Sequence, residues 1–156
     1  EEPDESGSTY AENARLKARA GRAAAPADAW VVGEDSGIEA RALRGAPGIH
    51  SARWDDHGVA RMLRELHEES ERGARYVCAI VALGPGGEEH VVEGVLEGRI
   101  ARAAVGSGGF GYDPIFVPLG EERTVAQLGD AWKARHSHRA RAASALADVL
   151  SRVARR

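Results

Sequence analysis

Two apolar segments joined by a turn of glycine and proline lie in the middle of the chain. Residues 75–83 and 90–96 have the composition of strands, and Gly84-Pro85-Gly86-Gly87 between them is typical of a hairpin with a longer loop. Strands joined by so short a connection pair antiparallel. The fold must therefore contain an antiparallel sheet, for which residues 100–105 and 115–117 supply further strand candidates.

Helical patterns flank this hairpin on both sides. Thr9-Tyr10-Ala11-Glu12 has the spacing of a capping box and predicts a helix over residues 13–25. Apolar residues at helical spacing predict two more helices, over residues 59–72 and from Ser137 to Arg156. The alternation of helical and strand patterns indicates an α/β fold.

The composition is that of a folded protein without a polyanionic partner. Hydrophobic residues make up 43% and charged residues 29% of the 156, and the formal net charge of −3 favours neither a nucleic-acid polymer nor a membrane surface. The longest apolar stretch is too short to cross a bilayer, and the first residues are acidic, unlike a secretory signal. We expect a cytoplasmic protein with one domain over residues 1–156. Because the chain opens with Glu1 rather than methionine, we also expect it to begin inside a longer gene product.

Adjacent carboxylates form the first candidate site. Glu34-Asp35-Ser36-Gly37 follows a short apolar strand predicted over residues 30–33, and loops at strand ends commonly build sites. Carboxylates suit hard cations such as Mg²⁺ and can orient a water molecule. Since neighbouring residues of an extended strand point to opposite faces, we expect only one carboxylate of the pair to face a given ligand. An ordinary acidic turn is the alternative interpretation.

A glycine-rich segment, Gly106 to Asp113, forms the second candidate site. Its glycines allow the backbone to lie close to a planar or anionic ligand. Phe110 and Tyr112 offer stacking surfaces, and Asp113 offers an acceptor for the N–H groups of a base. A flexible loop without a ligand is the alternative.

The third candidate site is basic and begins the C-terminal helix. Lysine occurs only at Lys17 and Lys133, so each can be needed as a compact ammonium. Ser137 can cap the helix, whose N-terminus then presents donors to an anion or a carbonyl group. A solvated basic helix start is the alternative. The chain contains no nucleophile elbow, P-loop or dinucleotide fingerprint, so the three sites together indicate a metal-dependent reaction on a nucleotide phosphate.

At these residues the chain resembles the inosine triphosphate pyrophosphatase family. In order and spacing the matching stretches cover nearly the whole chain: residues 9–14 with Lys17, Glu34-Asp35-Ser36-Gly37-Ile38, residues 43–49 and 51–53, Gly106 to Phe116, and Ser137-His138-Arg139. The family's first strand and its phosphate-binding T/S-x-N-x-x-K loop would lie upstream of Glu1. Residues 54–61 form a shorter segment than is usual in the family, and Ala140 stands where a glycine is common.

The resemblance implies a fold and an activity. The fold would be α/β, with an elongated mixed β-sheet, flanking helices and two lobes around a nucleotide cleft, and the protein would be a homodimer. The activity would be Mg²⁺-dependent hydrolysis of dITP, ITP and XTP, purine nucleoside triphosphates, to the monophosphate and pyrophosphate. Asp35 would hold the metal and activate the water that attacks the α-phosphorus, with Asp4 or Glu5 as a second metal ligand.

The resemblance also implies how the base is recognised. Lys133 would contact the substrate, and His138 with Arg139 would donate to the 6-oxo group of hypoxanthine or xanthine. Adenine presents an amino donor at this position, so the protein donors and the amino group would all lack acceptors. The catalytic efficiency for adenine nucleotides would then fall by about 10⁴-fold or more. Ser36 would lie against the nucleotide, and Phe110, Gly111, Tyr112 and Asp113 would line the base pocket.

Two other functions compete with this one. One is a catalytically inactive nucleotide-binding homologue or fragment. The family's phosphate-binding loop would lie upstream of Glu1, outside this sequence, and this favours that alternative. The other is a Maf-type pyrophosphatase, which acts on other nucleotides. The Ser137-His138-Arg139 cluster disfavours this alternative.

Overall fold

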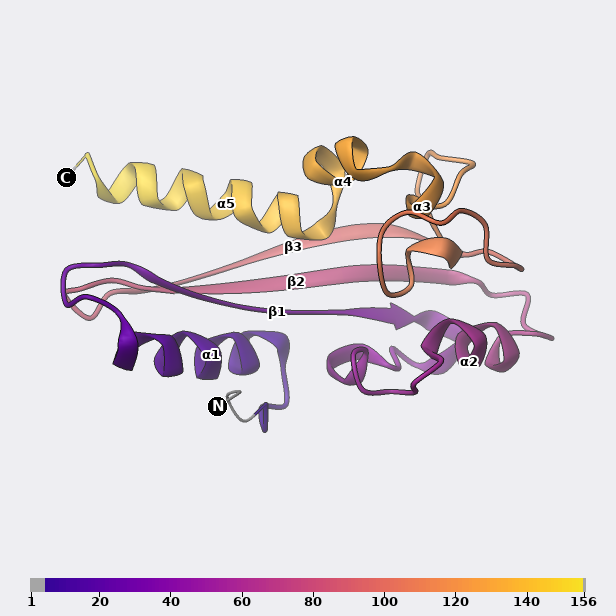
Figure 1. Cartoon of the computed structure of the whole chain (residues 1–156), viewed down its shortest axis with the longest axis horizontal. Helices are drawn as coiled ribbons and strands as arrows, with labels where there is room; N and C mark the ends of the chain where they lie inside the picture. Colours follow the sequence, from indigo (N-terminus) through magenta and orange to yellow (C-terminus); the bar gives the residue numbers. More distant parts are fainter. Residues whose placement is uncertain (1–4, 156) are drawn as a thin grey trace.

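The computed structural model describes residues 5–155, which form an elongated antiparallel sheet flanked by helices (Figure 1). The predicted α/β class is confirmed, but the sheet was expected to be mixed, whereas each pairing between the described strands is antiparallel, in the order β1-β2-β3-β4. Along the chain the elements are α1 (Tyr10–Ala24), β1 (Val31–Ala40), η1 (Arg41–Leu43), η2 (Gly48–His50), α2 (Gly58–Glu65), β2 (Gly73–Leu83), β3 (Glu89–Ile100), η3 (Asp113–Ile115), β4 (Phe116–Pro118), α3 (Val125–Leu128), α4 (Asp130–His136) and α5 (His138–Val153).

The predicted hairpin is the centre of the sheet. Strands β2 and β3 pair over their whole length, and β2 is buried at almost every position because helices cover both of its faces. Cys78 and its even-numbered neighbours in β2 pack with Ala142 and Leu146 of α5, whereas Val81 packs with Ala14 and Ala18 of α1. Figure 1 shows these two helices on opposite sides of the strands.

Two glycines let the helices approach the sheet closely. A Cβ on Gly33 of β1 would lie 2.0 Å from the carbonyl oxygen of Ala14 in α1, and a Cβ on Gly94 of β3 would lie 2.1 Å from that of His138 in α5. Any side chain at these positions would push the helix away. Both helices are thus held against the strands at the level of their N-terminal halves.

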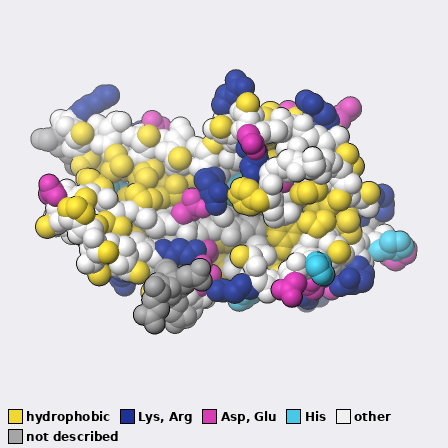
Figure 2. Space-filling model, viewed as in Figure 1, with side chains coloured by type: hydrophobic (Ala, Val, Ile, Leu, Met, Phe, Trp, Pro, Cys, Tyr) yellow, Lys and Arg dark blue, Asp and Glu magenta, His cyan; other side chains and the backbone are white. Residues whose placement is uncertain are grey.

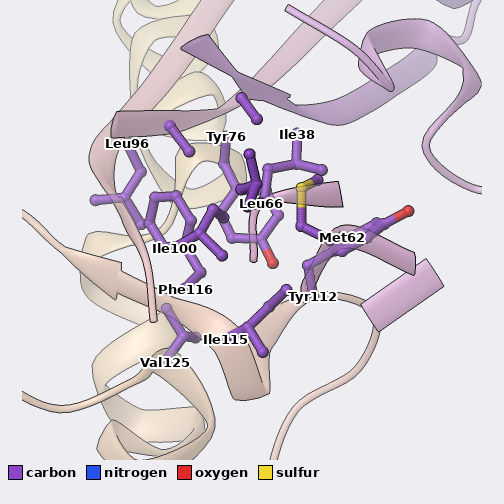
Figure 3. Close-up of a cluster of buried hydrophobic side chains, with 12 residues drawn as sticks. Ile38, Met62, Leu66, Tyr76, Leu96, Ile100, Tyr112, Ile115, Phe116 and Val125 are labelled. Carbon is purple, nitrogen blue, oxygen red and sulfur yellow. The ribbon is translucent and has the colours of Figure 1, made fainter. Parts of the chain in front are cut away.

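The larger hydrophobic cluster lies at the other end of the sheet (Figure 3). It gathers side chains from β1, α2, β2, β3 and the segment that contains η3 and β4, and most are fully buried: Ile38, Met62, Leu66, Tyr76, Leu96, Ile100, Tyr112, Ile115, Phe116 and Val125. This cluster fixes the segment that follows the glycine-rich residues 106–111 against the sheet.

The acidic segment is not the turn that the sequence suggested. Residues 34–37 continue β1, which runs from Val31 to Ala40, because every one of them pairs with the buried strand β2; Asp35, for example, lies opposite Ala79. The gain from sheet pairing outweighs the turn preference of Asp, Ser and Gly.

Two other predictions about elements were wrong. Helix α2 ends at Glu65 rather than at residue 72, and residues 101–105 form no strand. The Arg72 side chain contacts the end of α2 and the end of β3. Its guanidinium donates to the carbonyl oxygen of Leu66, which follows α2, and to those of Ile100 and Ala101, where β3 ends. The helices predicted from the capping box and at Ser137 are confirmed, with Thr9 and Ser137 as N-caps. Within residues 5–155, no helix is both long and apolar enough to cross a membrane.

Candidate functional site

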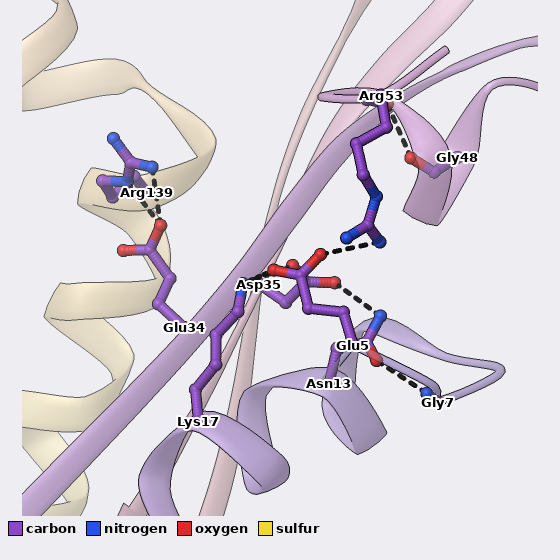
Figure 4. A network of polar contacts seen from close by, with 10 residues as sticks. Glu5, Gly7, Asn13, Lys17, Glu34, Asp35, Gly48, Arg53 and Arg139 are labelled. Carbon is purple, nitrogen blue, oxygen red and sulfur yellow. Dashed lines mark hydrogen bonds and ion pairs between the residues drawn. The ribbon is translucent and has the colours of Figure 1, made fainter. Parts of the chain in front are cut away.

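Asp35 faces helix α1 and is 7% exposed. Two side chains one helical turn apart on α1 reach its carboxylate: Asn13 Nδ2 donates to Oδ2 at 3.3 Å, and Lys17 Nζ lies 2.9 Å from Oδ1 (Figure 4). Neighbouring residue Glu34 points to the opposite face, where Arg139 of α5 pairs with it at 2.6 Å. The expectation that the two adjacent carboxylates face different ways is confirmed.

Glu5 joins Asp35 through the same lysine. Lys17 Nζ lies 2.6 Å from Glu5 Oε1, and Arg53 Nη2 lies 2.8 Å from Glu5 Oε2. The hydrogen bond from Lys17 outweighs burial and, with the charge of Arg53, lowers the pKa of Glu5. Burial acts to lower the pKa of Lys17, but the two carboxylates together raise it. The other carboxylate proposed beside the metal, Asp4, lies outside the described residues.

Asp113 is the centre of a second buried polar cluster. Tyr76 donates its hydroxyl to Asp113 Oδ1 at 3.0 Å, and Lys133 Nζ lies 2.7 Å from Oδ2. The backbone N–H of Phe110 also donates to Oδ2, at 3.0 Å. Gly109 makes this contact possible, because its φ is +73° and a Cβ there would lie 2.2 Å from Oδ2. Asp113 therefore organises the glycine-rich loop, and protein donors already occupy both of the oxygens that we predicted would accept from a base.

His138 lies beside this cluster as a neutral imidazole. Its ring stacks on that of Tyr76, with centroids 4.6 Å apart and planes 8° apart. Burial, assisted by the charges of Arg139 and Lys133, lowers the pKa of His138 to about 4. Nδ1 is buried without a hydrogen-bond partner in the described structure. Because an unpaired buried N–H costs more than an unpaired lone pair, we assign the proton to Nε2.

Phe110 completes the cluster with an exposed ring. Its side chain is 65% exposed, while Lys133 Nζ lies 3.9 Å and Arg139 Cζ 5.7 Å from the ring centroid. Cations near the π-system hold the ring without burying it. The ring is therefore available to stack on a planar ligand.

A cleft of about 890 Å³ is lined by the second cluster and by one side of β1. The volume suits a nucleotide-sized ligand. Figure 2 shows basic and acidic side chains meeting in the middle of the molecule on the face viewed there. Asp35 does not line the cleft, although its neighbours Ser36 and Gly37 do. β1 is the edge strand of the sheet that the described strands form. The lining includes all of the residues predicted to contact the base or nucleotide: Ser36, Phe110, Gly111, Tyr112, Asp113, Lys133, His138 and Arg139.

Sequence reasoning assigned no specific contact to Asn13, Lys17 or Tyr76, which belong to these clusters. Asn13 and Lys17 lie in a stretch that carried the family resemblance, so their i, i+4 spacing on a predicted helix was the available signal. Tyr76 offered no signal, because an aromatic residue in an apolar strand is typical of a core.

Comparisons with known proteins agree with the motifs. The family model described as the Ham1 family matches residues 1–149. The dITP/XTP pyrophosphatase of Gloeobacter violaceus is 47% identical over 152 residues, which are 96% of this chain and 77% of that protein. The protein of the same name from Bdellovibrio bacteriovorus is 41% identical, over 96% of this chain and 78% of its own length.

Solved structures give the same result. The Staphylococcus aureus Ham1 protein superposes with a TM-score of 0.89 at 39% identity, over 97% of this chain and 81% of that one. The nucleoside-triphosphatase (dITP/XTP pyrophosphatase) of Mycobacterium abscessus superposes with a TM-score of 0.76 at 44% identity, over 94% of this chain and 80% of that one.

Proposed function

Since this chain belongs to the Ham1 family, we propose that it hydrolyses the non-standard purine nucleoside triphosphates dITP, ITP and XTP to the monophosphate and pyrophosphate. It is an enzyme of the hydrolase class, a nucleoside triphosphate pyrophosphatase like its named relatives. The sequence motifs predicted this family. A homodimer and a cytoplasmic location remain predictions.

The observation that carries the proposal is the pairing of two unlike clusters across the edge strand β1. Asp35, with Lys17 and Asn13, lies on the α1 side. The aromatic and cationic residues around Asp113 lie in the cleft, on the side of β1 from which Glu34 reaches α5. A nucleotide whose base lies in the cleft can extend its phosphates over β1 toward Asp35. Base recognition and phosphate chemistry thus fall to different faces of one strand.

Asp35 is the proposed general base. Its carboxylate would accept a proton from the water that attacks the α-phosphorus, while pyrophosphate leaves. Lys17 would supply positive charge to the phosphate oxygens, where negative charge must be offset. Asn13 keeps the carboxylate in place through its hydrogen bond to Oδ2.

The carboxylates fit a Mg²⁺ ion. Oxygens of Glu5 and Asp35 both contact the single Nζ atom of Lys17, so they are close enough to share one cation. Mg²⁺ is commonly held by one or two carboxylates together with water and substrate phosphates, a set that Glu5, Asp35 and a bound nucleotide would supply. When bound, the metal would offset charge on the phosphate oxygens.

The proposed base contacts are donors to a 6-oxo group. His138 carries its proton on Nε2 by the argument above, and Arg139 and Lys133 are cations beside the ring of Phe110. A 6-oxopurine accepts from such donors, whereas the 6-amino group of adenine cannot. Rejection of adenine nucleotides therefore follows from the proposed contacts.

The test is pyrophosphate release from dITP, XTP, dATP and dGTP, each with and without Mg²⁺. We expect Mg²⁺-dependent release from dITP and XTP, with kcat/KM for dATP lower by about 10⁴-fold or more. Comparable turnover of dATP would contradict the proposed base recognition. No release from any of the four would favour a nucleotide-binding protein without catalysis.

A further inference from the structure

Every carboxylate oxygen that we assign to the metal already has a donor from the protein. Asp35 Oδ1 and Glu5 Oε1 contact Lys17 Nζ, at 2.9 Å and 2.6 Å. The other two oxygens are also engaged, since Asn13 donates to Asp35 Oδ2 and Arg53 pairs with Glu5 Oε2. A divalent cation shared by both carboxylates would take the place that the Lys17 ammonium holds between Asp35 Oδ1 and Glu5 Oε1.

Lys17 is the donor that a cation would displace first. Among residues 5–155 it is the one group that pairs with both carboxylates, and its side chain is 27% exposed, so its ammonium can move toward solvent. Two carboxylates in one place repel each other unless a cation lies between them. The ammonium provides that cation in the free protein.

We propose that Lys17 occupies the metal position in the free protein, so that the ammonium and the divalent cation compete for Asp35 Oδ1 and Glu5 Oε1. This inference rests on the metal requirement of the proposed function. The phosphates of a substrate offer the displaced ammonium new partners. Metal and nucleotide then bind cooperatively. The metal releases the Lys17 ammonium for the phosphates, and the phosphates draw the ammonium away from the metal position, so the coupling passes through Lys17.

The first test measures metal affinity without nucleotide. Binding of Mn²⁺ is followed by calorimetry in the wild type, Lys17→Met, Lys17→Arg and a control, Arg15→Met. The control removes the same charge from α1, but Arg15 pairs with Glu89 at 2.7 Å instead of with the site. We expect Lys17→Met to bind Mn²⁺ more tightly by about fivefold or more, with Lys17→Arg and Arg15→Met within about twofold of the wild type. Unchanged or weaker binding by Lys17→Met would overturn the competition.

The second test needs no variant that alters the site. With nitrogen-15 lysine the protein gives two side-chain ammonium signals, because Lys17 and Lys133 are its two lysines. Lys133 pairs with Asp113 and serves as an internal control. We expect Mg²⁺ to shift the Lys17 signal over the concentration range in which calorimetry detects binding, and to leave that of Lys133 unchanged.

The outcomes separate this inference from the proposed function. A Lys17 signal that does not move while calorimetry shows bound metal overturns the competition and leaves the metal requirement intact. Turnover that does not depend on metal, with no metal bound by any variant, overturns both. Release of Lys17 by metal supports the competition even if dITP proves not to be the preferred substrate.

Discussion

Asp35 and Glu34 are neighbours with different partners, and the difference comes from the alternation of side chains along a strand. Asp35 lies among Asn13, Lys17 and Glu5, while Glu34 pairs with Arg139. We expect Asp35→Asn to lower kcat for dITP by about 10³-fold, because an amide cannot accept the proton of the attacking water. The melting temperature should fall only slightly, since Asn keeps the shape of the side chain. A kcat within tenfold of the wild type would remove Asp35 from the role of base.

Tyr76 links Asp113 to His138, through its hydroxyl and its ring. Tyr76→Phe keeps the stacking but removes the donor to Asp113, at a cost of about 1 kcal/mol. We expect KM for dITP to rise by about threefold or more while kcat changes less, because the residue positions the base contacts. The matched control is Tyr10→Phe, which removes another buried hydroxyl, one that lies 3.4 Å from Glu39. Equal effects of the two variants on KM would argue against a positioning role.

His138 makes the stability of the fold depend on pH. Burial lowers its pKa to about 4 in the folded state, below the value of 6.5 for an exposed histidine. Between these values the unfolded chain binds a proton that the fold does not, so stability falls as the pH decreases from about 6.5 to 4. In urea titrations, we expect the wild type to lose up to about 3 kcal/mol more than His138→Gln over this range. Parallel pH profiles would show that the imidazole is not buried as the structure places it.

At the scale of elements, α1 supplies Asn13 and Lys17 to one cluster and α5 supplies His138 and Arg139 to the other, and glycines set the distance of both helices from the sheet. In Gly94→Ala the new Cβ would lie 2.1 Å from the His138 carbonyl oxygen and 2.4 Å from the backbone nitrogen of Ala142. Since both contacts are with backbone, α5 must shift. We expect a loss of about 2 kcal/mol in stability and a higher KM for dITP.

The control for this variant lies in the hairpin turn. Gly86→Ala would bring its Cβ only to the flexible carboxylate of Glu88, 3.0 Å away. We expect a change in stability below about 0.5 kcal/mol and an unchanged KM. Similar losses in the two variants would mean that close packing of α5 is not what positions the base contacts.

At the scale of the whole molecule, the sequence predicted the elements that have strong local signals. The capping box at Thr9, the hairpin around Gly84 and the cap at Ser137 all appear in the structure. Residues 34–37 were misjudged because their local turn preference competes with pairing to β2, a contact that no local pattern reveals. The contacts of Tyr76 with Asp113 and His138 could not be predicted for the same reason, since the three residues are far apart in the sequence.

The proposed reaction at Asp35 requires that water attacks the α-phosphorus of the nucleotide. Hydrolysis of dITP by the wild type in water labelled with oxygen-18 tests this requirement most directly, with the products analysed by mass spectrometry. We predict one labelled oxygen in dIMP and none in pyrophosphate. Label in pyrophosphate, or release of inorganic phosphate from the γ position, would contradict the account.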